Sequence, residues 1–241
     1  MPIRRLRRLA RWKYALRETA LIVVGVLIAL GVNAWWSQRQ DRARERLYIS
    51  QLESDARANE RILSAAIGED SASLAGLVSL SSALRSGEPP IGSATAIFDV
   101  ALRYSDPRPV LGTLDHLVES GAIEIVRAAR LRLAILQYTS LVHADLDEVN
   151  RHVDLLLAAM RSWVSRQQNA GLDCPMFVAT SKAENLACDK DFKKAWPVLQ
   201  RDPEYRAAVH AVRVGTWNRL FYLRRMLDET RQFREKLNRS P

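Results

Sequence analysis

Residue types that can bind a metal ion or transfer a proton are concentrated in one short stretch of the chain. They are His143, Asp147, Glu148, Asn150, His152 and Asp154. At helical spacing His143 and Asp147 share a face, and a neighbouring helix with further ligands would complete a metal site. The stretch also lies opposite an apolar seam, and charged residues in that position are typical of a solvated helix surface. We therefore expect no catalytic, cofactor-binding or metal-binding residues. The alternative is a metal-dependent or hydrolytic enzyme that uses His143, Asp147 and His152.

Two cysteines, Cys174 and Cys188, are the other reactive side chains. Zinc binding by a cysteine pair needs two more ligands at close spacing, and no histidine or second cysteine pair lies nearby. In an oxidising compartment two such thiols form a disulfide that persists. Closing a loop of this length stabilises a fold by about 3 kcal/mol through chain entropy alone. We therefore predict a disulfide between Cys174 and Cys188.

Catalytic and nucleotide-binding motifs are absent from the sequence. Ser120-Gly121 lacks the G-x-S-x-G context of a nucleophile elbow, and no phosphate-binding loop or dinucleotide fingerprint occurs. The formal net charge is +9, but the first 19 residues hold seven basic residues and one acidic residue, so the remainder is nearly balanced. Because aromatic residues do not alternate with a basic stripe, we expect no nucleic-acid partner.

An uncharged stretch, residues 20–36, organises the chain. As a helix it extends roughly 25 Å, which is at the short end of what a bilayer core requires. Basic residues beside a membrane stay in the cytoplasm, which predicts a basic cytoplasmic arm (1–19), a transmembrane helix (20–36) and an extracytoplasmic helical domain (37–241). A cleaved secretory signal is the alternative, because positions 32–34 loosely fit the small-residue cleavage pattern.

Five residues are predicted to serve this membrane anchor. Gly25 and Ala29 form a small-x-x-x-small pair, which lets two helices approach closely. Asn33 is polar near the outer end, where it is either hydrated at the interface or hydrogen-bonded to a partner helix. Trp35 and Trp36 suit the outer interface, where amphipathic rings gain from both phases.

Glycine, proline and hydrophobic periodicity divide the remainder into helices. The first helix is expected to continue outward and to end at Gly68, after which Asp70 or Ser71 caps a second helix reaching Arg85. Residues 169–190 are expected to be irregular. The other predicted helices are 94–104, 113–118, 124–166, 192–196 and 202–237, the last starting at Asp202-Pro203.

Two of these helices carry a sustained apolar seam. In 124–166 it comprises Leu131, Ile135, Tyr138, Val142, Leu146, Val149, Val153, Leu156, Met160 and Trp163. In 202–237 it comprises Tyr205, Val209, Val212, Thr216, Leu220, Leu223 and Leu227, with Gly215 weakening the helix locally. Trp217, Phe221 and Tyr222 are expected to fill a bundle end. Because no strand pattern appears, we predict an all-α fold in which one N-terminal transmembrane helix continues into a bundle with long central and C-terminal helices.

The anchor and one later stretch resemble a family of uncharacterised bacterial single-pass membrane proteins. The matching anchor residues, typical of that family's Glu-led helix with its Ala-Leu and Asn-Trp signature, are Glu18, Val24-Gly25, Ile28-Ala29-Leu30, Asn33 and Trp35. Residues 117–126, followed by Leu131-Arg132 and Tyr138, are similar to its Ser-Gly turn before a long helix. The resemblance implies a membrane-anchored helical domain and supplies no activity or catalytic residues. The Arg-rich arm and Trp36 depart from the family pattern, which leaves the partner open.

These observations favour a protein of the bacterial inner membrane, with a periplasmic domain, that acts by binding as a scaffold, sensor or accessory subunit of a membrane complex. The expected partners are the lipid bilayer and a membrane or envelope protein, or a second copy of the chain. A stalk that spans toward another envelope layer, as phage spanins do, is a further alternative. It would need an unbroken coiled coil, and the Gly/Pro-rich loops at 87–92 and 106–112 argue against it.

Overall fold

The computed structural model describes residues 3–90, 98, 103–172 and 182–239. Within these residues the chain is all-helical and contains no strand, which confirms the predicted fold class. The elements are α1 (Ile3–Ser86), α3 (Gly112–Glu119), the short 3-10 helix η1 (Ala122–Ile125), α4 (Ala129–Asn169), α5 (Lys182–Leu199) and α6 (Pro203–Asn238).

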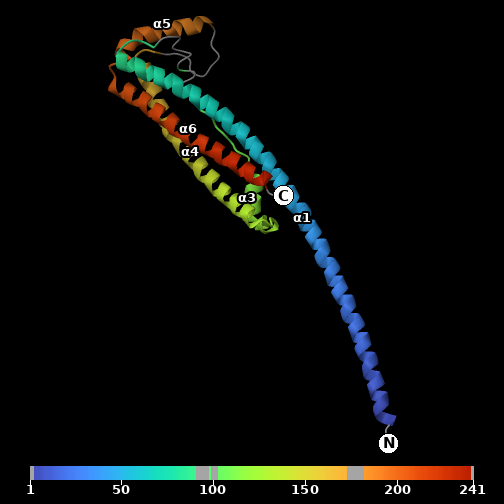
Figure 1. Cartoon of the computed structure of the whole chain (residues 1–241). Coiled ribbons are helices and arrows are strands. Elements are labelled where there is room, and N and C mark those ends of the chain that lie inside the picture. Colours follow the sequence, from blue (N-terminus) through green and yellow to red (C-terminus); the bar gives the residue numbers. More distant parts are fainter. Residues whose placement is uncertain (1–2, 91–97, 99–102, 173–181, 240–241) are drawn as a thin grey trace.

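Helix α1 is a single rod of 84 residues that leaves the bundle and projects far beyond it (Figure 1). At 1.5 Å per residue its length is roughly 126 Å. From residue 20 to residue 36 every side chain is exposed, although the stretch is apolar. This is the one helix among the described residues that is long and apolar enough to cross a membrane.

The predicted helix end at Gly68 is wrong, because α1 continues through it to Ser86. Gly68 is exposed, and a Cβ added there would meet no atom within 4 Å. The buried residues of α1 keep a spacing of three or four residues across this point, so the core holds the helix together. They are Leu52, Ala56, Asn59, Leu63, Ala66, Asp70, Ser73, Leu77, Leu80 and Leu84, with Ala83 also buried beside the last of them.

Helix α6 is the central element of the bundle and packs along both α1 and α4. Figure 1 shows α1 and α4 running in one direction and α6 returning in the other, with α5 at the end far from the N-terminus. The segment before α3 lies against α1, where the Asn59 side chain and the Val110 backbone exchange two hydrogen bonds of 2.6 and 3.0 Å.

The seam predicted for the long central helix forms the bundle core. All of its residues are buried except Leu146 and Val153, which are half-buried. The helix begins at Ala129 rather than at 124, because η1 and the extended residue Val126 precede it. Gly121 has a φ of 71°, the left-handed conformation that glycine adopts readily, so the predicted Ser-Gly break is confirmed.

Of the other predicted helix boundaries, one is confirmed and one is wrong. The final helix begins as predicted, because the Asp202 carboxylate accepts hydrogen bonds from the backbone N–H groups of Glu204 and Tyr205. The stretch expected to be irregular up to residue 190 is wrong from Lys182 onward, where α5 starts. Most of the predicted helix 94–104 lies outside the described residues, and Phe98 within it is buried in the core. Gly215 faces the core, where an added Cβ would lie 3.3 Å from Leu156 Cδ1.

Candidate binding surface on helix α6

An exposed apolar stripe runs along α6. Trp217 and Phe221 are 59 % and 52 % exposed, and Val214, one turn earlier, is 39 % exposed. Their spacing of three and four residues places all three on one face of the helix. The prediction that Trp217 and Phe221 fill a bundle end is therefore wrong, whereas Tyr222 is half-buried. We call Val214, Trp217 and Phe221 the α6 stripe.

A groove of about 430 Å³ accompanies the α6 stripe. Its apolar lining comes from Trp217, Leu220 and Phe221. Its polar lining consists of Arg224, Arg225, Asp228, Glu229 and Gln232, all on the same helix. Large apolar rings are thus bordered by charged side chains of both signs.

Arg225 connects this surface to α4. Its Nε donates a hydrogen bond of 2.8 Å to Asp145, whose side chain is only 1 % exposed. Its guanidinium carbon also lies 5.8 Å from the ring centre of Phe221 and 5.1 Å from that of Tyr222. The two rings meet edge to face at 5.3 Å. Contacts with Arg225 and Tyr222 therefore hold the Phe221 ring in place, although about half of this side chain is exposed to solvent.

A buried ion pair fixes the opposite side of α6. Arg219 Nη2 lies 3.4 Å from Asp70 Oδ2 of α1, and the two side chains are 0 % and 1 % exposed. The backbone N–H and the hydroxyl of Ser105 donate to Asp70 Oδ1 at 3.0 and 2.9 Å. Burial raises the pKa of the Asp70 carboxyl and lowers that of the Arg219 guanidinium, although each charge opposes the effect on the other. Arg219 thus lies on the side of α6 that faces α1, and the α6 stripe lies on the opposite, exposed side.

The predicted histidine and acid face does not converge on one point. His143 Nε2 lies 2.9 Å from Asp115 of α3, whereas His152 Nδ1 contacts the backbone oxygen of Glu148 at 2.8 Å. Asp147, Asn150 and Asp154 are exposed. Among the residues that the structure describes, no group of three or more histidine, cysteine or acidic side chains is placed to hold a metal ion.

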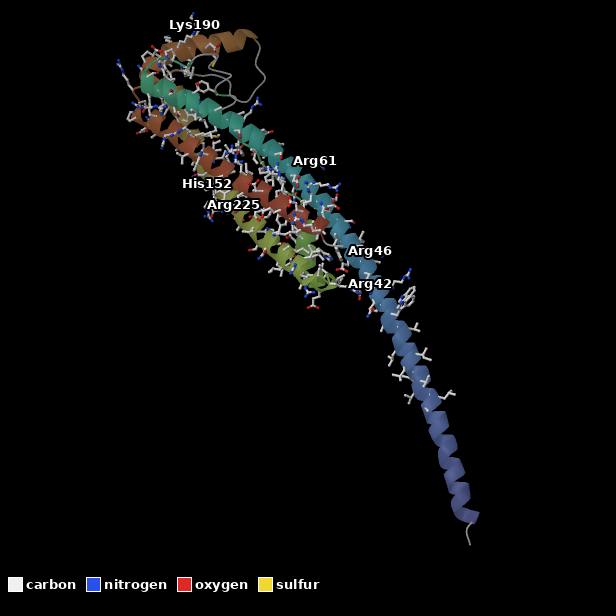
Figure 2. All side chains as sticks on the ribbon, viewed as in Figure 1. Arg42, Arg46, Arg61, His152, Lys190 and Arg225 are labelled. Atoms are coloured by element: carbon white, nitrogen blue, oxygen red, sulfur yellow. The ribbon has the colours of Figure 1, made fainter. Side chains whose placement is uncertain are left out.

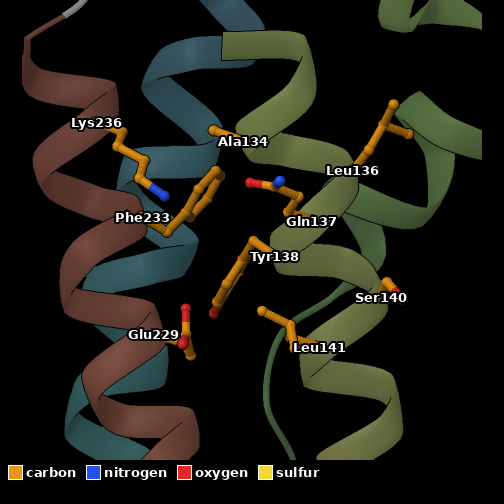
Figure 3. A pocket seen from close by; sticks show the side chains of 9 residues that line it. All are labelled: Ala134, Leu136, Gln137, Tyr138, Ser140, Leu141, Glu229, Phe233 and Lys236. Carbon is orange, nitrogen blue, oxygen red and sulfur yellow. The ribbon is translucent and has the colours of Figure 1, made fainter. Parts of the chain in front are cut away.

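A second groove, of about 630 Å³, lies between α4 and α6 (Figure 3). Its floor is made by Tyr138 and Phe233, whose rings stack at 4.3 Å. The Tyr138 hydroxyl is 2.9 Å from the Thr230 hydroxyl, and burial raises the pKa of Tyr138. Glu229 and Lys236 line the groove from α6. The floor belongs to the packed core, so this groove is a hollow between two helices rather than a chamber.

The remaining predicted residues lie at the two ends of the molecule. Cys188 is buried in α5, and Cys174 lies outside the described residues, so their disulfide stays a prediction. The anchor residues Gly25, Ala29, Asn33, Trp35 and Trp36 all lie on the exposed part of α1. The Arg39 guanidinium carbon is 5.8 Å from the Trp35 ring centre.

Comparisons with protein-family models, with curated proteins and with solved structures find no match to this chain. The family resemblance of the anchor therefore stays a prediction. The prediction that Asp70 or Ser71 caps a second helix is wrong, because both lie inside α1, and neither Ser105 nor Arg219 is singled out by the sequence. Helical spacing could have indicated that Asp70 and Arg219 are buried. Asp70 continues the seam spacing of α1, and Arg219 lies three residues after Thr216 in the seam of α6.

Proposed function

We propose that this chain is a membrane-anchored protein that acts by binding another protein, with the α6 stripe as its docking surface. Residues 20–36 cross the bacterial inner membrane with the N-terminus in the cytoplasm, and the bundle lies on the periplasmic side. The single observation that carries the proposal is the exposure of Trp217 and Phe221 beside a charged groove.

The position of the stripe favours a protein over a bilayer as its occupant. Along the axis of α6, Arg219 lies between Trp217 and Phe221, although it faces the opposite side of the helix. It pairs with Asp70, which is 34 residues beyond Trp36 on the continuous helix α1. This separation corresponds to about 50 Å along the helix axis. Lipid that surrounds residues 20–36 therefore lies far from Trp217. Aromatic side chains bordered by arginine are the residues that most often dominate protein interfaces.

The anchor favours a partner in the same membrane, because confinement to one surface raises the effective concentration of each protein for the other. A scaffold, a sensor and an accessory subunit all require this binding step. The predicted Cys174–Cys188 disulfide suits the same compartment, and the burial of Cys188 supports a structural role for it. No observation favours the alternative enzyme, since His143 and His152 engage separate partners.

Site-directed photo-crosslinking tests the docking surface in intact cells. A photoreactive residue at position 217 should crosslink to one membrane protein that can be identified by mass spectrometry. The matched control is position 198, where Val198 is 60 % exposed on α5. Phe221→Ala should weaken the crosslink about 30-fold, the effect typical of a hot-spot residue. A crosslinked product of twice the chain mass would assign the surface to self-association.

Equal crosslinking from positions 217 and 198, or a product that survives Phe221→Ala unchanged, would refute the docking surface. The anchor is tested separately. The full-length chain should stay with membranes through a carbonate wash, and protease added to spheroplasts should digest the bundle. A soluble product that begins at Trp35 would show that the segment is a cleaved signal.

A further inference from the structure

We propose that the end of the bundle nearest residues 20–36 binds the head groups of anionic lipids. This end, which we call the foot, presents exposed arginines from two parts of the chain that are distant in sequence. They are Arg39 and Arg42 on α1, Arg127 in the connection before α4 and Arg130 in the first turn of α4. The inference rests on the proposed membrane crossing of α1.

The foot lies close to residues 20–36 along α1. Arg127 Nη2 donates to the backbone oxygen of Gln38 at 3.4 Å, and Gln38 is only two residues beyond Trp36. That is about 3 Å along the helix axis. The head-group layer extends roughly 5–7 Å beyond the hydrocarbon on each side of a bilayer. With Trp36 at the edge of the hydrocarbon, the guanidinium of Arg127 therefore lies within the head-group layer.

Contacts of Arg127 and of the turn beside it join this level of α1 to the bundle. Its backbone N–H donates to Glu45 Oε1 at 2.6 Å, and its Nε lies 4.0 Å from Glu45 Oε2. Arg132 Nη1 donates to the backbone oxygen of Val126 at 2.9 Å, which secures the turn into α4. These contacts hold the segment that contains Arg127 against α1 at this level.

The foot carries an excess of positive charge. Residues 37–46 and 122–130 together contain six arginines and three acidic residues. One of the acids, Glu45, is only 15 % exposed and faces Arg127. The first turn of α4 contains no acidic residue. Figure 2 labels Arg42 and Arg46 where α1 leaves the bundle, and both are exposed. A net positive surface at head-group level fits a bilayer that carries anionic lipid.

Hydrogen exchange of the full-length chain in lipid nanodiscs tests the inference. One set of discs contains phosphatidylcholine alone, and the other contains phosphatidylcholine with phosphatidylglycerol. Amides of residues 122–130 should exchange at least about fivefold more slowly in the anionic discs, which is the factor that one basic residue supplies at such a surface. Because the attraction is electrostatic, high salt should remove the difference.

The variant Arg42→Glu/Arg130→Glu should abolish the difference between the discs. The matched control, Arg201→Glu/Arg206→Glu, makes the same charge change at exposed positions and should keep the difference. Arg201 lies just before α6 and Arg206 in its first turns, at the end of the bundle opposite the foot (Figure 1). Equal exchange in the two kinds of disc, or slowing that persists in the foot variant, would overturn the inference. If the chain does not insert into discs at all, the membrane crossing fails instead, which is a distinguishable result.

Discussion

Arg219 of α6 and Asp70 of α1 face each other inside the bundle, with Nη2 and Oδ2 3.4 Å apart and both side chains almost completely buried. Each occupies a seam position that apolar residues hold elsewhere on the same helix. The pair therefore adds little attraction beyond the cost of removing two charges from water. It does lie on the face of α6 that meets α1, opposite the exposed Trp217 and Phe221.

Removing only the cation should be costly. Arg219→Met leaves the Asp70 carboxylate buried without its counter-charge and should lower the free energy of unfolding by about 3–5 kcal/mol. Asp70→Asn/Arg219→Met removes both charges and keeps an acceptor for Ser105, so it should recover most of the loss. Urea denaturation of the three proteins in the same detergent measures both effects. A double variant as unstable as the single one would mean that the pair itself stabilises the fold.

The loss in Arg219→Met should depend on pH. Burial raises the pKa of Asp70 in the folded protein, and the charge of Arg219 partly opposes that rise, so the variant should have a still higher pKa. A raised folded-state pKa means stability that is present below the unfolded value and is lost as pH rises through the folded value. The gap between variant and wild type should therefore be small near the ordinary value of 3.8 and grow toward neutral pH. A constant gap would indicate a packing defect.

Gly68 lies inside an exposed, uninterrupted turn of α1, with open space around its Cα. Gly68→Ala should therefore stabilise the protein by about 0.5–1 kcal/mol, because alanine loses less backbone entropy in a helix. Gly215→Ala serves as the contrast, since the added methyl group would meet Leu156 at 3.3 Å. It should gain less or destabilise. Thermal melting followed by circular dichroism distinguishes the two, and no gain from Gly68→Ala would indicate that α1 bends there in solution.

Replacement by alanine should destabilise the protein strongly at one tryptophan of the bundle and hardly at all at another. Trp163 is fully buried and meets Phe98 and Tyr205 edge to face, so Trp163→Ala should cost about 3–5 kcal/mol. Trp217 is 59 % exposed, and Trp217→Ala should change stability by no more than about 0.5 kcal/mol. Denaturation of both variants in parallel checks the assignment. A large loss from Trp217→Ala would place this ring in the core and remove it from the docking surface.

Hydrophobic periodicity was sufficient to predict the long helices, because α4 and α6 bury the residues that recur every three or four positions. It failed at Gly68 because glycine and the following Asp70 together resemble a helix end and a new cap. The carboxylate is instead needed in the core by a cation 149 residues later. Single-sequence reasoning cannot pair such distant residues, and an aspartate in a seam looks like a break.

The candidate binding surface was missed for a related reason. Trp217 and Phe221 are large and apolar, and composition alone assigns such rings to a core. Their exposure follows from the rotation of α6, which depends on Arg219 facing α1 and on Arg225 facing α4. Whether the helix face opposite a polar residue is buried or exposed can be predicted only when the partner of that polar residue is known.

The absence of any break in α1 between Ala20 and Ser86 has a mechanical consequence. A continuous ladder of backbone hydrogen bonds resists torsion as well as bending, so the rod behaves as a lever without a hinge. Under the proposed membrane crossing, a rotation of residues 20–36 about the helix axis would therefore turn α1 and the helix packed along it together.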